Sequence, residues 1–132
     1  MSHRSTLRYA IYFTPHPASA LWRFGCEVIG YDAASGCNAP HFDHPVLRAE
    51  LTPSRLQEPA RYGFHATLKP PFELAAGATR ADLLEAAQRF AARRQPIALA
   101  RLAVIRIGSF LALTPVETPR ELGELADACV RD

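Results

Sequence analysis

The sequence predicts an α+β fold, an antiparallel sheet with helices packed on one face. Strand-like segments, in which apolar residues alternate, are interspersed with segments of helical periodicity in the order β-α-β-α-β-β-α. A Gly-Ser pair joins two consecutive β-rich runs, which is a hairpin signal. The 132 residues suffice for one domain, which we expect to bury roughly two-thirds of the surface that the unfolded chain exposes.

The first half of the chain predicts a strand, a helix and a long loop. Alternation predicts a half-buried strand over residues 7–14, which Pro15 ends. Apolar residues at helical spacing predict a helix over residues 19–29 that stops near Gly30. Residues 32–60 are rich in proline, glycine and polar side chains, so we expect a long loop that acts as a lid or a binding loop.

The second half predicts a strand, a helix and the hairpin. A strand over residues 61–74 is followed by a helix that Thr79 caps and Pro96 ends. Two β-rich runs, 97–107 and 110–114, form the predicted hairpin.

The last predicted element is a helix at the end of the chain. Thr118 supplies an N-cap, Pro119 the first helical position and Glu121 a capping-box carboxylate. The helical pattern continues to Asp132 without a stop signal, so we expect the chain to stop in mid-helix.

The composition is that of an ordinary globular protein, with 48% hydrophobic and 21% charged residues. A formal net charge of +2 is too small for an extended nucleic-acid footprint, although it is compatible with a small anionic ligand.

Three cysteines without a CxxC pair are typical of reduced thiols in a cytoplasmic protein. The N-terminus has no apolar signal region, and no stretch approaches the roughly 18 apolar residues of a membrane span. We therefore expect a soluble, cytoplasmic protein.

The strand predicted over residues 61–74 carries the residues best suited to chemistry. Because side chains alternate between the faces of a strand, His65, Thr67 and Lys69 share one face, and the residues between them face the core. An imidazole exchanges a proton near neutral pH, a hydroxyl donates to a phosphate oxygen, and an ammonium adds positive charge. We expect the double proline at 70–71 to end this strand.

Two interpretations of this face are open on the residues alone. His65 is a hydrogen-bonded histidine on a solvated sheet face, with Thr67 present for its strand propensity, or the two residues act together on a phosphate ester. A single His-x-Thr triplet does not decide between them.

Longer stretches of the sequence carry a family resemblance. The string RYGFHATLKPPF, preceded by RYAIYFTP and followed by FLALTP, resembles the two-histidine (2H) phosphoesterase superfamily, and within it the branch associated with bacterial phosphonate-utilisation operons. The resemblance implies a bilobal fold whose lobes each bring one His-x-Thr motif to a shared cleft, without a metal or other cofactor. It also implies that His65 acts as an acid or a base and that Thr67 donates to a phosphate oxygen.

The sequence departs from that family pattern in one respect. No second His-x-Thr or His-x-Ser follows Thr67, and no histidine follows it at all. We therefore expect residues 1–132 to be the N-terminal lobe, with the C-terminal lobe absent from this chain, or else a degenerate site. A single lobe would be nearly inactive, and the sheet surface that it leaves uncovered would favour a homo-oligomer.

Other residues are secondary candidates. Tyr12, Arg61 and Tyr62 would contact a phosphate or stack on a base, or else simply pack beside the sheet. Lys69 would bind the ligand or neutralise a neighbouring carboxylate. The His41-Phe42-Asp43-His44 segment offers metal-type ligands without the spacing of a known site, so we expect a solvated loop there and no metal.

Two functional hypotheses follow from these residues. The first is a metal-independent phosphoesterase in phosphonate metabolism, which uses general acid-base catalysis on a small cyclic phosphodiester, such as a phosphoribosyl or nucleotide cyclic phosphate. The second is a binding module that holds a nucleotide or sugar phosphate through Thr67 and Lys69 without turning it over. Only the enzyme would consume its ligand.

Overall fold

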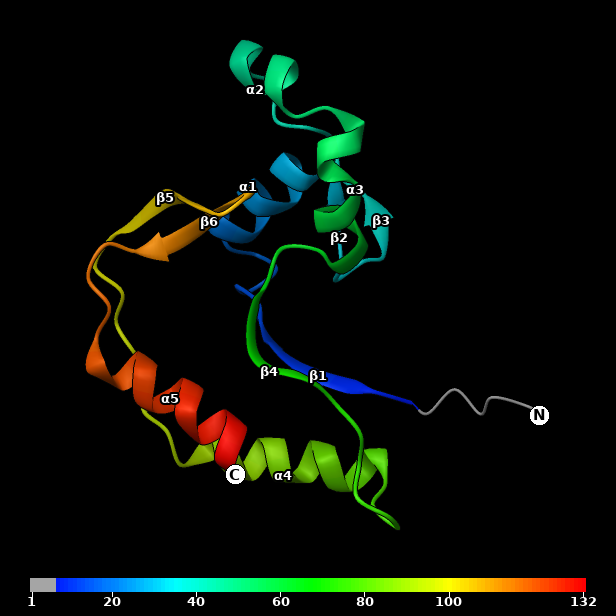
Figure 1. Ribbon diagram of the computed structural model, residues 1–132, viewed down its shortest axis with the longest axis vertical. Coiled ribbons are helices and arrows are strands. Elements are labelled where there is room, and N and C mark those ends of the chain that lie inside the picture. Colours follow the sequence, from blue (N-terminus) through cyan, green and yellow to red (C-terminus); the bar gives the residue numbers. More distant parts are fainter. Residues whose placement is uncertain (1–6) are drawn as a thin grey trace, which may run out of the picture. The chain divides into compact units, whose positions relative to one another are not determined.

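The computed structural model describes residues 7–132, so most of the N-terminal segment that we expect to lack a signal region lies outside the described residues. The order of the elements can be followed in Figure 1. The chain divides into a first unit, Ile11–Thr67, and a second unit, residues 7–10 with Leu68–Asp132. Among the described residues, no helix has the length and hydropathy that a membrane span requires.

The strands of the described chain form three two-stranded sheets. β1 (Tyr9–Phe13) pairs with β4 (Ala66–Phe72), β2 (Tyr31–Asp32) with β3 (Cys37–Asn38), and β5 (Leu102–Ile107) with β6 (Phe110–Pro115). With five helices along the described residues, the predicted α+β class is confirmed. The strands do not join into the one sheet that we expected, because each described strand pairs with a single neighbour.

α1 (Ala20–Ile29) begins and ends where the sequence predicts. The Ser19 hydroxyl accepts from the backbone N–H of Trp22, with 3.1 Å between oxygen and nitrogen. Gly30 ends the helix at a φ of 82°, a left-handed conformation that glycine adopts without steric cost. The helix buries Trp22 and Cys26, each of which is 4% exposed. Local signals therefore define this helix, and its apolar side chains supply the core of the first unit.

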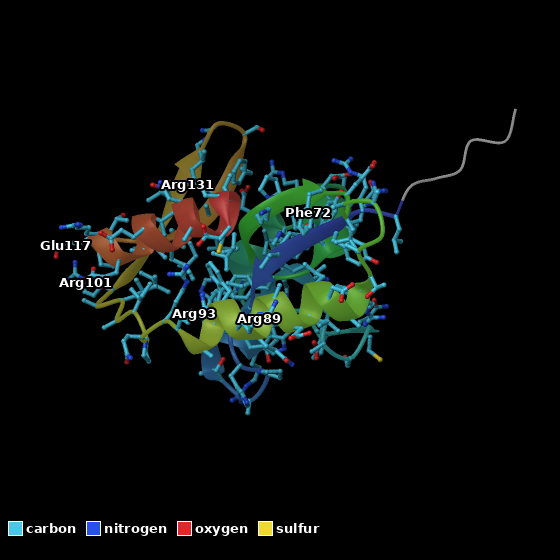
Figure 2. The ribbon with its side chains drawn as sticks, turned by 90° about the horizontal axis from the view of Figure 1, so that it is seen from below. Phe72, Arg89, Arg93, Arg101, Glu117 and Arg131 are labelled. Carbon is cyan, nitrogen blue, oxygen red and sulfur yellow. The ribbon has the colours of Figure 1, made fainter. Side chains whose placement is uncertain are left out.

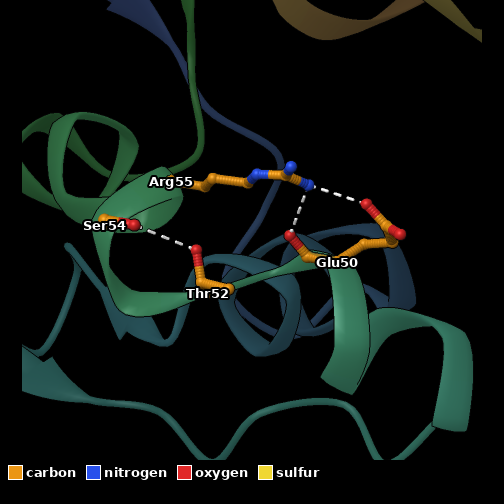
Figure 3. Close-up of polar contacts among 4 residues, drawn as sticks. All are labelled: Glu50, Thr52, Ser54 and Arg55. Carbon is orange, nitrogen blue, oxygen red and sulfur yellow. Dashed lines mark hydrogen bonds and ion pairs between the residues drawn. The ribbon is translucent and has the colours of Figure 1, made fainter.

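The prediction of a long loop over residues 32–60 is wrong, because this region contains the β2–β3 hairpin and two helices, α2 (Pro45–Glu50) and α3 (Pro53–Tyr62). Each helix begins with a proline, whose missing N–H is not needed at the first helical position. These prolines therefore start helices, although the sequence analysis interpreted them as a sign of a loop. Arg55 bridges the junction of the helices by donating from Nη1 to the Glu50 carbonyl at 2.9 Å and to its carboxylate at 2.7 Å (Figure 3).

The strand predicted over residues 61–74 is shorter in the structure. Its first residues belong to the end of α3, and β4 begins only at Ala66. The strand continues through Pro70 and Pro71, contrary to the prediction that they end it. One edge of a strand in a two-stranded sheet requires no N–H, and because successive N–H positions face opposite edges, this accounts for one of the two prolines. Burial does not alternate as expected either, since Ala66 is exposed.

The predicted hairpin of the second unit is confirmed from Leu102 onward. β5 and β6 are antiparallel with Ile107 opposite Phe110, and Gly108 adopts a φ of 59° in the turn between them. Residues 97–101 precede the hairpin without regular structure, so this part of the predicted strand is wrong. The turn glycine is therefore a more reliable signal than the strand boundaries.

One helix precedes the hairpin in sequence and another follows it. α4 (Arg80–Ala92) starts with a capping box, in which the Thr79 and Asp82 side chains each accept from the other residue's backbone N–H. α5 (Arg120–Arg131) begins one residue later than the predicted threonine cap would place it. Its N-cap is Pro119, which makes no side-chain cap bond because its side chain has no hydrogen-bonding group.

Charged side chains cover the helices of the second unit. Arg89 on α4 pairs with Glu85, and Arg131 on α5 pairs with Asp127, each across one helical turn; both arginines are labelled in Figure 2. Such exposed pairs stabilise a helix by only roughly 0.2–0.5 kcal/mol each. They indicate solvated helix faces and do not point to a binding site.

Candidate active site

His65 lies between the end of α3 and the start of β4, one residue before the strand on which we predicted it. Gly63 ends α3 by donating its N–H to the Pro59 carbonyl at 2.9 Å. Its φ of 79° and ψ of −178° belong to a region that is essentially restricted to glycine. This turn brings the Gly63 carbonyl to the His65 ring, with 2.9 Å between the carbonyl oxygen and Nδ1.

That contact determines the tautomer of the His65 ring. A carbonyl oxygen only accepts, so the hydrogen of the pair is on Nδ1. In the neutral ring, Nε2 then keeps a free lone pair. The ring is therefore arranged to take a proton at Nε2, and to return it from the same atom.

Two tyrosine rings lie close to the imidazole. Tyr12, from β1, stacks on the His65 ring with 4.0 Å between the centroids and 28° between the planes. Tyr62, the last residue of α3, lies 6.4 Å from the same ring and is tilted by 54°. The tyrosines are 38% and 50% exposed, so the imidazole is held among aromatic rings without being sealed from solvent. Sequence alternation did not indicate either contact.

Arg61 and Tyr62 reach this region from α3, and not from the strand on which we predicted them. Cζ of Arg61 lies 5.7 Å from the centroid of the Tyr62 ring. The Gly63 turn, which the sequence analysis did not single out, therefore brings Tyr62 beside His65. The signal that could have revealed it is a glycine directly after a helical segment and two residues before the histidine.

Thr67 is the second residue of β4 and is exposed. The prediction that Thr67 and His65 share one face of a strand is not borne out as stated, because His65 precedes the first residue of β4. The Lys69 ammonium donates to the Val130 carbonyl of α5 at 3.3 Å and lies 5.3 Å from the Phe72 ring centroid. Lys69 is thus occupied within the second unit, whereas Thr67 belongs to the first.

Residues 41–44 do not form a metal site in the structure. Asp43 pairs with Arg48, and the His44 ring stacks on Phe42 with 6.4 Å between the centroids. Within residues 7–132, no three His, Cys, Asp or Glu side chains are grouped so that they could hold a metal ion.

An open cavity of about 310 Å³ in the first unit is lined by residues of α1 and the segments beside it, and His65 is not among them. Two of its lining groups have shifted pKa values. The backbone N–H of Ala34 holds the pKa of Asp32 below its usual value. Burial, with a smaller effect of the carboxylates of Asp32 and Glu27, raises the pKa of the Cys26 thiol. A buried thiol with a raised pKa is a poor nucleophile, so this cavity does not provide a competing catalytic group.

The chain is similar to proteins named ribose 1,5-bisphosphate phosphokinase PhnN. It is 39% identical over 124 residues to the one from Laribacter hongkongensis and 37% identical over 130 residues to the one from a Janthinobacterium species. These stretches cover 94% and 98% of this chain but only 29% of each relative, so the chain spans less than a third of the curated relatives it matches. No solved structure shows a significant match.

Residues 67–132 match the model of a family described as "Protein of unknown function (DUF1045)". The match begins at Thr67, so it includes Thr67 and Lys69 and leaves out His65. This is the family associated with phosphonate operons, which confirms that part of the sequence-based identification, while membership of the 2H superfamily stays a prediction. Because the match covers half of its residues, the chain belongs to the DUF1045 family.

Proposed function

We propose that this chain carries a metal-independent phosphoesterase site that opens a small cyclic phosphodiester in phosphonate metabolism. The observation that carries the proposal is the fixed His65 ring, whose Nδ1–H donates to the Gly63 carbonyl while Tyr12 stacks on its face. This arrangement leaves Nε2 of a partly exposed histidine to exchange protons, as a general acid or base requires.

In the proposed reaction, Nε2 of His65 takes a proton from a water molecule as the water oxygen bonds to phosphorus. The bond from phosphorus to one ring oxygen of the ester breaks, and that oxygen is protonated as it leaves, which yields a phosphomonoester. The Thr67 hydroxyl donates to a non-bridging oxygen, while Arg61 and Tyr62 contact the phosphate and an attached ring. Lys69, whose ammonium donates to the Val130 carbonyl, has no role in this step.

The reaction also needs an acid at the leaving oxygen. One histidine cannot serve the nucleophile and the leaving group in the same step. Residues 66–132 contain no histidine, so the proposal takes the second acid from another lobe, as the 2H resemblance implies, or from a second copy of the chain. The chain by itself is expected to react slowly.

The names of the relatives support a sugar-phosphate substrate. The relatives are also long enough to carry a second activity outside the matched part. Their name assigns them a kinase reaction on ribose 1,5-bisphosphate. This chain contains no Gly-x-x-x-x-Gly-Lys-Ser/Thr segment, the loop with which P-loop enzymes bind nucleotide phosphates. We therefore assign the named kinase reaction to the part of each relative that lies outside the matched 29%, and the phosphoesterase reaction to the matched part. A ribose-based cyclic phosphate fits both assignments.

Consumption of a nucleoside 2′,3′-cyclic phosphate, followed by ³¹P NMR at high chain concentration, tests the proposal. His65→Gln is expected to lower the rate by about 10²- to 10⁴-fold, the usual contribution of a general acid or base. Thr67→Val removes the phosphate donor and should also lower the rate. His44→Gln, at an exposed histidine outside the site, is the matched control and should leave the rate unchanged.

Three outcomes would count against the proposal or redirect it. An unchanged rate in His65→Gln would contradict the catalytic assignment. Binding of the ester without consumption would favour the alternative, a module that holds a nucleotide or sugar phosphate through Thr67 and Lys69. Inactivation by EDTA that zinc or manganese reverses would contradict the metal-independent mechanism. A rate per chain that rises with chain concentration would support the homo-oligomer that the sequence led us to expect.

A further inference from the structure

We infer that Tyr12 is a positioning residue that keeps the His65 ring in its Nδ1–H tautomer. The catalytic meaning of this inference rests on the proposed function of His65. The state of the ring can be measured by itself, so the inference can fail or hold independently of that function.

The two rings share one face. Their centroids are 4.0 Å apart and their planes differ by 28°, so the face of Tyr12 that covers His65 cannot also stack on a ligand base. Any rotation of the imidazole out of its plane would break this stacking. Tyr12 therefore limits the ring to two in-plane orientations that differ by half a turn about the Cβ–Cγ bond.

The Gly63 carbonyl selects one of these two orientations. The hydrogen bond that one imidazole nitrogen makes decides which nitrogen is protonated, so the tautomer depends on the orientation of the ring. In the observed orientation Nδ1 lies 2.9 Å from the carbonyl oxygen, whereas a half-turn would place a carbon there. Stacking and hydrogen bond thus act together, and without the stacking the ring could rotate away from the carbonyl.

Tyr62 differs from Tyr12 in this respect. Its ring is 6.4 Å from His65 and tilted by 54°, which is not a stacked geometry, and it is the more exposed of the two tyrosines. The structure therefore separates the two tyrosines, which sequence reasoning had grouped as substrate-binding residues. Tyr12 stacks on the histidine, whereas the ring of Tyr62 is tilted away from it and lies 5.7 Å from Cζ of Arg61.

Long-range ¹H–¹⁵N correlation spectra of the ¹⁵N-labelled chain test the inference, because they distinguish protonated from unprotonated ring nitrogens. The His65 signals are assigned by their loss in His65→Gln. In the neutral ring, we expect a protonated Nδ1 and an unprotonated Nε2 in the wild type and in Tyr12→Phe, which keeps the stacking. Tyr12→Leu should shift the signals towards a mixture of tautomers.

Tyr9→Leu is the matched control. Tyr9 lies on the same strand as Tyr12, and its ring faces Phe72 with 6.4 Å between the ring centroids. This substitution should leave the His65 nitrogens unchanged. Unchanged nitrogens in Tyr12→Leu, or an equal shift in Tyr9→Leu, would overturn the inference. With the cyclic ester, Tyr12→Leu should lower kcat and leave KM unchanged, and a rise in KM alone would overturn the positioning role. If no variant consumes the ester, the proposed function fails, and the spectra still decide the role of Tyr12.

Discussion

The two units of the chain bury their apolar side chains to different extents. In the first unit, Trp22 and Leu56 are buried, whereas in the second unit Cys129 is the buried apolar side chain of the described residues. The β5–β6 hairpin leaves Val104 and Leu111 exposed by 64% and 67%. A two-stranded hairpin is only marginally stable by itself in water. The second unit therefore has a smaller buried core to stabilise it than the first unit has.

This difference bears on where a site can be built. A reactive side chain stays in position only when its neighbours are themselves held by packing and hydrogen bonds. His65 and Tyr12 belong to the unit that has the buried core, although the family match lies in the other half of the chain.

The largest effect is expected from a truncation in the core of the first unit. Trp22→Ala removes a side chain that is 4% exposed and should lower the free energy of unfolding by about 3–5 kcal/mol. Leu111→Ala, on the exposed hairpin, should change it by less than about 0.5 kcal/mol. Urea unfolding of both variants measures the difference, and equal losses would show that the two units are packed alike.

A pair of glycine substitutions in helices should act in opposite directions. A Cβ at Gly25 in α1 would overlap the Phe64 ring, so Gly25→Ala should destabilise the chain by about 1–3 kcal/mol. A Cβ at Gly123 in α5 would meet nothing within 4 Å, so Gly123→Ala should stabilise it by about 0.5–1 kcal/mol. Thermal unfolding measures both changes, and two changes of the same sign would contradict the comparison.

Thiol labelling compares how readily the two units open. Cys37 is exposed and should react at once, while Cys26 and Cys129 are buried and react only when their surroundings open. Relative to the denatured chain, Cys129 should be alkylated about tenfold faster than Cys26, which corresponds to about 1.4 kcal/mol less protection. Mass spectrometry of timed samples measures the rates. Faster labelling of Cys26 would reverse the predicted order.

The smallest effect concerns the start of α4 at low pH. The hydroxyl of Thr79, followed by its backbone N–H, lowers the pKa of the Asp82 carboxylate below its ordinary value of 3.8. A lowered pKa in the folded state means that Asp82 stabilises the fold above pH 3.8 and loses this effect as the pH falls through its folded pKa. The stability difference between the wild type and Asp82→Asn should therefore shrink below pH 3.8, as thermal melts would measure. A difference that is independent of pH would contradict the capping role of the carboxylate.

Features that depend on neighbouring residues could be predicted from the sequence. Ser19 and Gly30 bound α1, Thr79 starts α4 and Gly108 turns the hairpin, as predicted. Each of these signals acts on backbone groups within a few positions, so no distant contact is needed to interpret it. The choice of His65 and Thr67 also came from a local motif, and their roles remain predictions.

The surroundings of the candidate histidine depend on contacts between residues that are distant in sequence. Periodicity predicts the side of a strand to which a side chain points, but it does not predict which ring from a distant strand contacts that side chain. The stacking of Tyr12 on His65 depends on the pairing of β1 with β4, and the tautomer depends on the Gly63 turn after α3. The proline-initiated helices were missed for a related reason. A proline can start a helix or lie in a loop with the same local sequence signal, and the packing of the residues after it decides between the two.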